Sequence, residues 1–359
     1  MTLHRGLWFR SFVTVTLTAF LIDASLAQDK SPALKGMEQA WSLKGAWTGV
    51  VSDEKKGLIY SVGLGGKCVE VDLAGKKQRE MNLPQNSGAI VRLANLSRDG
   101  GKVLLAFTAW SGELRAYDLD GKQLWSYASG IDDVWASDLD DDGSDEVIVG
   151  YNGGVGLHVL DSKGQLLWKT TGIGNVWHVC AGNVWGEGAP QVVTTSAAGQ
   201  VHVFSSDGKN RKDIDAGIYA NMVRVAKLSE KDKAAMIFVA GSALDGKPNP
   251  TTEMLTALTV YGAKNWTLAL PAGTPPHVDS AQVAPGKPWL ALGMRGGKVH
   301  VVDIEKGEMI ASVSEQGMTP EVGWATSKDS GAPLLLVATG LPLATGGSKL
   351  NAFRLAKPK

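Results

Sequence analysis

The sequence predicts an all-β fold, and three observations support this prediction. First, a motif recurs about every 45 residues: residues 114–125 read LRAYDLDGKQLW and residues 157–168 read LHVLDSKGQLLW. Second, weaker copies begin at Cys68, Val201, Leu255, Val299 and Leu350. Third, the chain contains 44 glycines, which suit a fold with many tight turns. A repeat of this length made of short strands and turns is typical of a β-propeller, with one blade per repeat.

Each repeat contains four strand-like segments in the same order. An inner segment such as residues 89–96 comes first, and a β-rich run such as residues 102–107 follows. A segment of alternating polarity, such as residues 114–118, leads through an Asp-x-x-Gly turn to a more polar strand that often carries Trp. Four short strands of this kind make one propeller blade. Seven inner strands are expected, near Trp47, Arg92, Trp135, Trp177, Arg224, Asp279 and Trp324.

The seventh repeat has no room for a fourth strand after residues 350–355. Residues 36–43 (GMEQAWSL) resemble residues 121–127 (GKQLWSY) with one residue inserted. We therefore expect residues 36–44 to supply the missing strand, which would pair an otherwise open sheet edge. The prediction is a seven-bladed β-propeller of four-stranded antiparallel blades over residues 36–357, with the last blade closed by the N-terminal strand. Long loops are expected at residues 242–254 and 341–348, which are rich in turn-forming residues.

The first 27 residues have the features of a secretory signal peptide. Basic residues precede a short apolar run, and Ser25 and Ala27 supply the small side chains of a cleavage site. We expect residues 1–27 to be removed and residues 28–35 to form a short linker. The mature protein is then expected to be a monomer in the periplasm or outside the cell, with no integral membrane segment.

The cysteines and several histidines are predicted to be structural. By the repeat register, Cys68 lies on the third strand of the first blade and Cys180 on the first strand of the fourth, which is too far apart for a disulfide. His158, His202 and His300 occupy the same position in three different blades. Such repetition favours packing within the scaffold over a metal site.

Residues 138–146 (DLDDDGSDE) form the sharpest chemical motif of the chain. Calcium binds six to eight hard oxygens, and alternating acidic residues on a tight loop supply them. The predicted ligands are the side chains of Asp138, Asp140, Asp142 and Glu146 and the carbonyl of Ser144. The alternative is a solvated acidic turn without an ion, although its crowded carboxylates would repel one another. The predicted Ca²⁺ is structural and holds the loop between two strands of the third blade.

Two family resemblances follow from these motifs. Residues 138–150 (DLDDDGSDEVIVG) resemble the calcium loop of FG-GAP/VCBS (integrin-α-type) repeats. The Asp-x-x-Gly-x-x-x-Trp ends at residues 118–125 and 161–168 resemble blades of the PQQ-like (quinoprotein dehydrogenase-type) superfamily. The resemblance implies a calcium-stabilised propeller that is usually not catalytic. No quinone is expected, because the chain lacks the adjacent cysteine pair often found in quinoproteins and its calcium loop lies at a blade edge.

The residues at the centre of the predicted inner strands are the candidate ligand site. In the repeat alignment they occupy one level, and at a channel mouth they would form a surface of Trp and Arg, which are common at binding hot spots. The set comprises Trp47, Arg92, Trp135, Trp177, Arg224, Asp279 and Trp324, with His178 and His277 beside it. The alternative is that each side chain fills the space between two blades, where an Arg would need a partner.

The predicted function is an exported, non-catalytic binding or scaffold protein stabilised by one structural calcium. Its ligand would be a protein or a glycan held at the channel mouth or by the loops. Nucleic acid is not expected, because 36 basic and 36 acidic residues balance. One alternative is a channel-mouth lyase or hydrolase acting on a polysaccharide through His178, His277, Arg92 and Arg224. Another is a periplasmic assembly factor that recruits partners through its loops or by β-augmentation.

Overall fold

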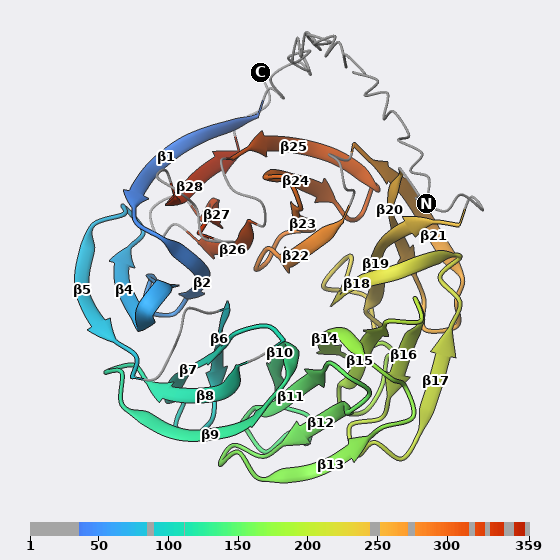
Figure 1. Ribbon diagram of the computed structural model, residues 1–359. Coiled ribbons are helices and arrows are strands. Elements are labelled where there is room, and N and C mark those ends of the chain that lie inside the picture. The colour runs from blue at the N-terminus through green and yellow to red at the C-terminus, as the bar shows by residue number, and fades with distance from the viewer. Residues whose placement is uncertain are drawn as a thin grey trace, which may run out of the picture. The chain divides into compact units, whose positions relative to one another are not determined.

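The computed structural model describes residues 36–84, 90–110, 112–244, 252–271, 277–315, 320–326, 331–340 and 348–355. Within these residues, 28 strands form seven antiparallel sheets of four strands each. The sheets surround a central axis as the blades of a propeller (Figure 1). The predicted fold class is therefore confirmed. The predicted signal peptide and linker, residues 1–35, lie outside the described part of the chain.

The strands of each blade follow one another from the axis outwards. The first blade contains β2 (Trp47–Asp53), β3 (Leu58–Gly63), β4 (Lys67–Asp72) and β5 (Lys77–Asn82), with the short 3-10 turn η1 (Leu64–Gly66) after β3. The second contains β6 (Ile90–Asn95), β7 (Lys102–Phe107), β8 (Glu113–Asp118) and β9 (Gln123–Ser129). The third contains β10 (Ile131–Ser137), β11 (Glu146–Tyr151), β12 (Gly156–Leu160) and β13 (Leu166–Thr170).

The remaining blades keep this order except at the closure. The fourth contains β14 (Val176–Gly182), β15 (Gln191–Ser196), β16 (Val201–Phe204) and β17 (Arg211–Ile214). The fifth contains β18 (Ile218–Ala226), β19 (Met236–Ala243), β20 (Glu253–Leu258) and β21 (Lys264–Leu270). The sixth contains β22 (Val278–Val283), β23 (Trp289–Met294), β24 (Lys298–Asp303) and β25 (Glu308–Ser314). The seventh contains β26 (Glu321–Thr326), β27 (Pro333–Ala338), β28 (Lys349–Leu355) and β1 (Met37–Lys44).

The N-terminal strand closes the ring, as predicted. Strand β1 pairs antiparallel with β28, from Met37 opposite Leu355 to Lys44 opposite Lys349. The last blade thus joins the two ends of the described chain, and both lie on the same side of Figure 1. This arrangement pairs an edge of β28 that would otherwise be open.

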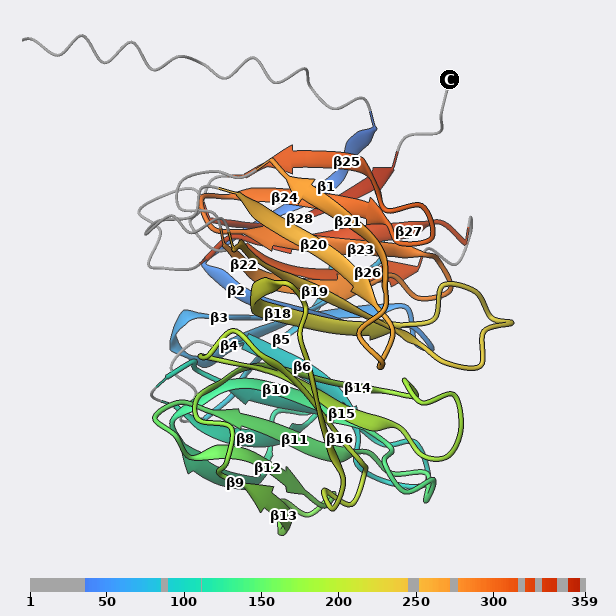
Figure 2. The same cartoon turned by 90° about the vertical axis from the view of Figure 1, so that its right-hand side faces the viewer.

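Apolar side chains fill the spaces between neighbouring blades. In the described residues, seven buried clusters each draw on two adjacent sheets. One of them joins Val62 of the first blade to Val91 and Leu104 of the second. Figure 2 shows the strands from the side of the ring. Because both faces of each sheet are covered, the second and third strands read as short continuous apolar runs.

Four tryptophans tie the outer edges of the blades together. Each lies on the outermost strand of one blade and donates its indole N–H to a carbonyl in the turn of the next blade. The pairs are Trp41 with Leu73 at 3.0 Å, Trp125 with Ser162 at 3.2 Å, Trp168 with Ser206 at 2.8 Å and Trp266 with Ile304 at 3.0 Å. We call these contacts the rim latches. The repeated Trp of the sequence motif therefore connects blades.

Each rim latch also explains a glycine in the turn of the next blade, which is an Asp-x-x-Gly turn in the first and third blades. The glycines beneath the indole rings are Gly75, Gly164, Gly208 and Gly307, all with φ between 69° and 81°. A Cβ atom added to any of them would lie 2.5–2.8 Å from the indole ring above it. The turn therefore needs glycine both for its left-handed backbone and for the close approach of the ring.

The buried histidines and cysteines are part of this scaffold. His158, His202 and His300 face equivalent residues of the second strands and are buried, which confirms that they pack within the blades. Cys68 lies on β4 and Cys180 on β14, as predicted, and both thiols are free and buried.

The predicted loop at residues 242–254 is too long. Strand β19 continues to Ala243 and β20 begins at Glu253, because Ser242 pairs with Glu253 across the hairpin. Residues 245–251 and most of the second predicted loop, residues 341–347, lie outside the described residues.

Candidate functional site

In the described part of the chain, the inner strands of five blades each contain one extra residue close to their start. A register shift near the start of β2, β10, β14, β18 and β22 leaves one residue unpaired as a β-bulge. The bulged residues are Thr48, Asp132, Trp177, Asn221 and Asp279. We call the end of the ring where the inner strands begin the leading face, and the opposite end the trailing face. A bulge redirects its side chain and is common next to functional sites.

The seven residues predicted to share one level of the channel do not share it. Arg92, Trp135 and Arg224 occupy one level. Trp177 and Asp279 are bulged residues at the leading face, and Trp47 precedes the bulge of β2. In the seventh blade Gly323 holds the level of Arg92, and Trp324 is the next residue along the strand. The prediction of a single ring is therefore wrong. The bulges account for only part of this difference, because each adds a single residue. The rest arises because no fixed motif sets the register of the inner strands, so Cys180, not Trp177, holds the level of Arg92 in the fourth blade.

Charged side chains cross the middle of the channel. Arg92 Nη1 lies 2.7 Å from Glu321 Oε1, and Arg92 Nη2 lies 3.2 Å from Asp133 Oδ1. The other oxygen of Asp133 accepts the backbone N–H of Val179 at 3.2 Å and lies 3.1 Å from His178 Nδ1. These contacts join the inner strands of the second, third, fourth and seventh blades.

Arg224 extends this network into the fifth and sixth blades. Its Nη1 lies 3.7 Å from Asp133 Oδ2, and its Nε donates to the carbonyl of Ala281 at 2.7 Å. Its guanidinium stands 4.9 Å from the centroid of the Trp135 ring, within range of a cation–π contact. Arg92 and Arg224 are only 7% and 2% exposed, so neither forms part of an open surface. Their predicted need for partners between the blades is met by two carboxylates and several carbonyls.

The network determines the charge state of its members. Burial alone would raise the pKa of Asp133, but the hydrogen bond from His178 and the charges of Arg92 and Arg224 outweigh it and hold this pKa well below its usual range. Burial lowers the pKa of His178, against the pull of Asp133. Burial also raises the pKa of Glu321, although Arg92 opposes the shift. Asp133 is thus the fixed negative charge around which the cations are arranged.

An aromatic cluster lies at the leading face, formed by Trp177, Tyr219 and His277. The ring centroid of Trp177 is 5.9 Å from that of Tyr219 and 6.4 Å from that of His277. Tyr219 is 38% exposed, and its hydroxyl donates to the carbonyl of Ala197. A Cβ on Gly199 would lie 2.5 Å from the Tyr219 ring, so this ring rests directly on a turn. The cluster is therefore held rigidly while part of its surface remains open.

Polar groups stand beside the aromatic cluster. Asp279 accepts two hydrogen bonds from Arg295, at 2.6 Å from Nη2 and 3.2 Å from Nε. His277 Nδ1 lies 3.2 Å from Asp279 Oδ1. Burial would raise the pKa of Asp279, but contacts with His277 and Arg295 outweigh it and lower this pKa. The leading face thus combines stacking surfaces with fixed hydrogen-bonding groups, as sites for polar small ligands do.

The trailing face holds a separate cavity of about 220 Å³. Its wall includes three of the predicted residues, Arg92, Trp135 and Trp324, together with apolar residues such as Leu93 and Val283. Trp324 is 4% exposed and donates its indole N–H to the carbonyl of Gln282 at 2.9 Å. These contacts show Trp324 packing between the sixth and seventh blades.

Trp47 belongs to neither group. It is 8% exposed and lines a different cavity with Gly45 and Gly63. A Cβ on Gly45 would lie 2.6 Å from its indole nitrogen, so the ring is packed against the backbone. Of the predicted set, only Trp177 and Asp279 thus lie together at the leading face.

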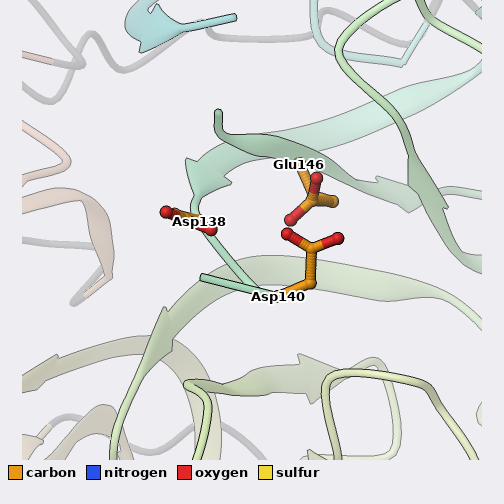
Figure 3. Close-up of side chains that lie close together, drawn as sticks. All are labelled: Asp138, Asp140 and Glu146. Carbon is orange, nitrogen blue, oxygen red and sulfur yellow. The ribbon is translucent and has the colours of Figure 1, made fainter. Parts of the chain in front are cut away.

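The acidic loop between β10 and β11 gathers three of its five predicted ligands. Carboxylate oxygens of Asp138, Asp140 and Glu146 lie within 4.8 Å of one another (Figure 3). The Glu146 carboxylate accepts the backbone N–H of Leu139 at 2.8 Å. Burial and the nearby aspartates raise the pKa of Glu146 to about 7. Excess negative charge with hard oxygen donors fits a calcium ion.

Other acidic residues of this loop bind protein groups. Asp142 pairs with Arg98 at 2.7 Å and accepts the backbone N–H of Ser144 at 2.8 Å. Asp145 accepts the backbone N–H of Asn95 at 2.6 Å and donates its own to the carbonyl of Asn95 at 2.6 Å. The loop is thus tied to the second blade as well as to the third.

Comparisons with known proteins agree on the fold. Residues 104–241 match the family model of the lambda-carrageenase beta-propeller domain. The WD40 beta propeller domain of Doa1 is similar over 90% of this chain and 98% of its own, with a TM-score of 0.60 and 15% sequence identity. No curated protein matches. The chain therefore contains a β-propeller domain, and neither match is to an FG-GAP or PQQ-like repeat. In the described residues, no helix is long and apolar enough to cross a membrane.

Several residues of the site were missed from sequence. Asp133 and Glu321 occupy equivalent positions in the third and seventh blades, but the other blades carry no carboxylate there, so no repeated motif marks them. Tyr219 and Arg295 reach the leading face only because β18 begins early and β23 ends there. The one available signal was the pair of buried arginines, whose charge required carboxylate partners in other blades.

Proposed function

We propose that this protein is an exported, non-catalytic β-propeller that binds a polysaccharide chain at its leading face. The observation that carries the proposal is the aromatic cluster, Trp177 with Tyr219 and His277, beside the Asp279–Arg295 pair. Aromatic rings stack on the apolar faces of sugar rings, and the fixed polar groups can bind sugar hydroxyls. Because the cluster rests on bulges and turns, it loses little freedom on binding.

The comparison with the carrageenase propeller supports a role with polysaccharides. The matched segment, residues 104–241, contains Trp177 and Tyr219 of the aromatic cluster. The name of the matched domain refers to an enzyme that acts on a polysaccharide. The match covers less than half of the chain, so it suggests the class of ligand and does not identify it.

Calcium and export are part of the same proposal. We assign one structural Ca²⁺ to the FG-GAP-like loop, with Asp138, Asp140 and Glu146 as the side chains placed to hold it. Asp142 would join them only by leaving Arg98. Because the loop is also tied to Asn95, the ion would stabilise the contact between the second and third blades. The signal-like features of residues 1–27 support the proposal of export.

The test is retention on a panel of acidic and neutral polysaccharides, carrageenan included, measured for the mature protein in calcium. Trp177→Ala should weaken binding about tenfold or more, as loss of one stacking surface does. Tyr261→Ala is the matched control, because Tyr261 is 77% exposed on a turn at the trailing face. Equal binding by wild type and Trp177→Ala, or equal loss in both variants, would overturn the proposal.

An enzyme at the same face is the second candidate. The specific observation is that His277 stands 3.2 Å from the Asp279 carboxylate, which could orient it as a general base or acid. Arg92 and Arg224 do not contribute to this site, because both are buried and paired with Asp133. Release of new chain ends from a retained polysaccharide, lost in His277→Ala but not in Tyr261→Ala, would favour the enzyme over the binding protein.

A further inference from the structure

Among the exposed large hydrophobic side chains of the described residues, Trp110 is the tryptophan. It is 72% exposed, and it lies in the turn between β7 and β8. Since β7 ends opposite the start of β6, this turn lies at the leading face. The second blade thus presents a large apolar ring on the same face as the aromatic cluster of the fourth, fifth and sixth blades.

The backbone of Trp110 is strained in order to present this ring. Its φ is 71°, and in the described part of the chain the only other residue with positive φ that is not glycine is Asp141. A bulky residue in the left-handed region persists only where the surrounding structure enforces it, and such residues gather at functional sites.

Neighbouring contacts enforce this conformation. The backbone N–H of Trp110 donates to the carbonyl of Ile131 at 2.6 Å, directly before the bulged Asp132 of β10. The turn is closed by a hydrogen bond from Gly112 N to Thr108 O at 3.0 Å. A Cβ on Gly112 would lie 2.9 Å from Thr108, so the turn is tight. The backbone of Trp110 is thus fixed to the mouth of the channel.

Nothing in the described residues gives the Trp110 ring a packing role. No described aromatic ring or cation stacks against it, in contrast to Trp135, Trp168, Trp177, Trp266, Trp289 and Trp324. It also differs from the rim tryptophans, each of which donates a hydrogen bond to the next blade. An exposed, rigidly placed Trp of this kind is typical of a binding hot spot.

We infer that Trp110 is a second stacking platform for the same ligand, which rests on the function proposed above. Trp110 belongs to the second blade and Trp177 to the fourth, with the third blade between them. Neighbouring sheets pack about 10 Å apart, so a single sugar ring cannot cover both platforms. The ligand is therefore a long polysaccharide that crosses the leading face with several consecutive units bound, and the site selects chains over mono- and disaccharides.

The test uses oligosaccharides of increasing length, prepared from whichever polysaccharide the wild-type protein retains, with affinities measured by calorimetry. Trp110→Asn is the informative variant, because Asn tolerates the left-handed backbone while removing the ring. We expect it to weaken binding of long chains about tenfold and to leave disaccharide binding unchanged. Trp110→Tyr, which keeps an aromatic face, should recover most of the affinity for long chains.

The outcomes separate this inference from the proposed function. If Trp110→Asn binds every length as well as wild type, or loses the same factor at every length, the second platform is wrong while Trp177 can still define a binding site. If the wild-type protein retains no polysaccharide, both the proposed function and this inference are wrong. An unchanged thermal melt of Trp110→Asn confirms that any loss concerns binding.

Discussion

The outer rim and the central channel of this propeller follow opposite rules. At the rim, the same contact recurs: an indole of one blade lies over the glycine turn of the next and donates to its carbonyl. In the channel, only some blades carry charged residues, Arg92 and Arg224 at one level and Asp133 and Glu321 at the next, and each contact of the ion network occurs once. The rim therefore contains the information that specifies a ring of blades, whereas the channel contains what is individual to this protein.

Two of the three exceptions at the rim keep the same geometry. Arg79 stands in the first blade where four other blades have Trp, and it pairs with Asp120 of the next blade at 2.7 Å. Lys212 of the fourth blade lies 5.1 Å from the ring of Tyr261 in the fifth. In six of the seven blades a long side chain reaches the next turn, and its chemistry varies; the sixth blade has Ala311 at this position. In the channel, by contrast, Asp133 and Glu321 hold equivalent positions in two blades, and the other five blades carry no carboxylate there.

The largest effect should come from breaking the channel network at Asp133. Asp133→Ala removes the carboxylate between Arg92, Arg224 and His178. It leaves buried Arg224 without a carboxylate partner and Arg92 with Glu321 alone, so we expect a loss of about 3–5 kcal/mol in the free energy of unfolding. Urea denaturation at neutral pH measures it. Asp207→Ala is the control, since Asp207 pairs with Lys209 at the surface and its removal should have little effect. A loss as small as that of the control would show that the network does not stabilise the ring.

The same network predicts how the stability of the folded protein changes with pH. The pKa of Asp133 is lower in the folded protein than its unfolded value of about 3.9. Its stabilisation is therefore fully present above about pH 4 and is lost as the pH falls below that value. Asp133→Ala should accordingly flatten the acid limb of the stability curve, measured as the melting temperature from neutral pH down to about pH 2. An acid limb identical to that of wild type would contradict this assignment.

A smaller effect is expected from one rim latch. Trp125→Ala loses one hydrogen bond and the contact with Gly164, for which we expect about 2–3 kcal/mol. Gly164→Ala should also destabilise, because its φ is 79° and the new Cβ would lie 2.8 Å from the indole. The two changes share one contact, so the double variant should be more stable than the sum of the single losses implies. Strict additivity in denaturant melts would contradict the latch.

This contrast explains how far sequence could lead. The Trp and Gly of the rim repeat at a similar spacing, so residues 114–125 and 157–168 predict the blades and their order, and the likeness of residues 36–43 to residues 121–127 predicts the closing strand. The inner strands carry no motif at a fixed spacing. Bulges at Asp132, Trp177 and Asp279 each add a residue, which no residue pattern marks. Trp177 lies before Cys180, the residue that holds the level of Arg92 and Arg224 in its blade. Partners from distant blades, such as Glu321 for Arg92, become neighbours only when the ring closes.

The smallest effect concerns the acidic loop. Like the contacts of the channel network it occurs once, and like the rim latches it joins two neighbouring blades. Calcium sites of extracellular modules bind with about 10⁻⁴–10⁻³ M affinity, so a few millimolar calcium should add about 1–2 kcal/mol of stability. Without calcium, the raised pKa of Glu146, about 7, means that the folded protein loses stability as the pH rises from its unfolded value of about 4.3 through 7. Calcium needs the ionised carboxylates, so its stabilisation should be greater at about pH 8 than at about pH 5.

Melting temperatures with calcium and with a chelator at these two pH values measure the effect. Glu146→Gln should abolish the calcium response and raise the stability of the calcium-free protein at the higher pH, because it removes the repulsion from Asp138 and Asp140. Asp141→Asn is the matched control, since Asp141 belongs to the same loop but not to the group of three carboxylates. If calcium stabilises Glu146→Gln as much as wild type, the ion does not bind at this loop, and the loop is held only by its contacts with Asn95 and Arg98.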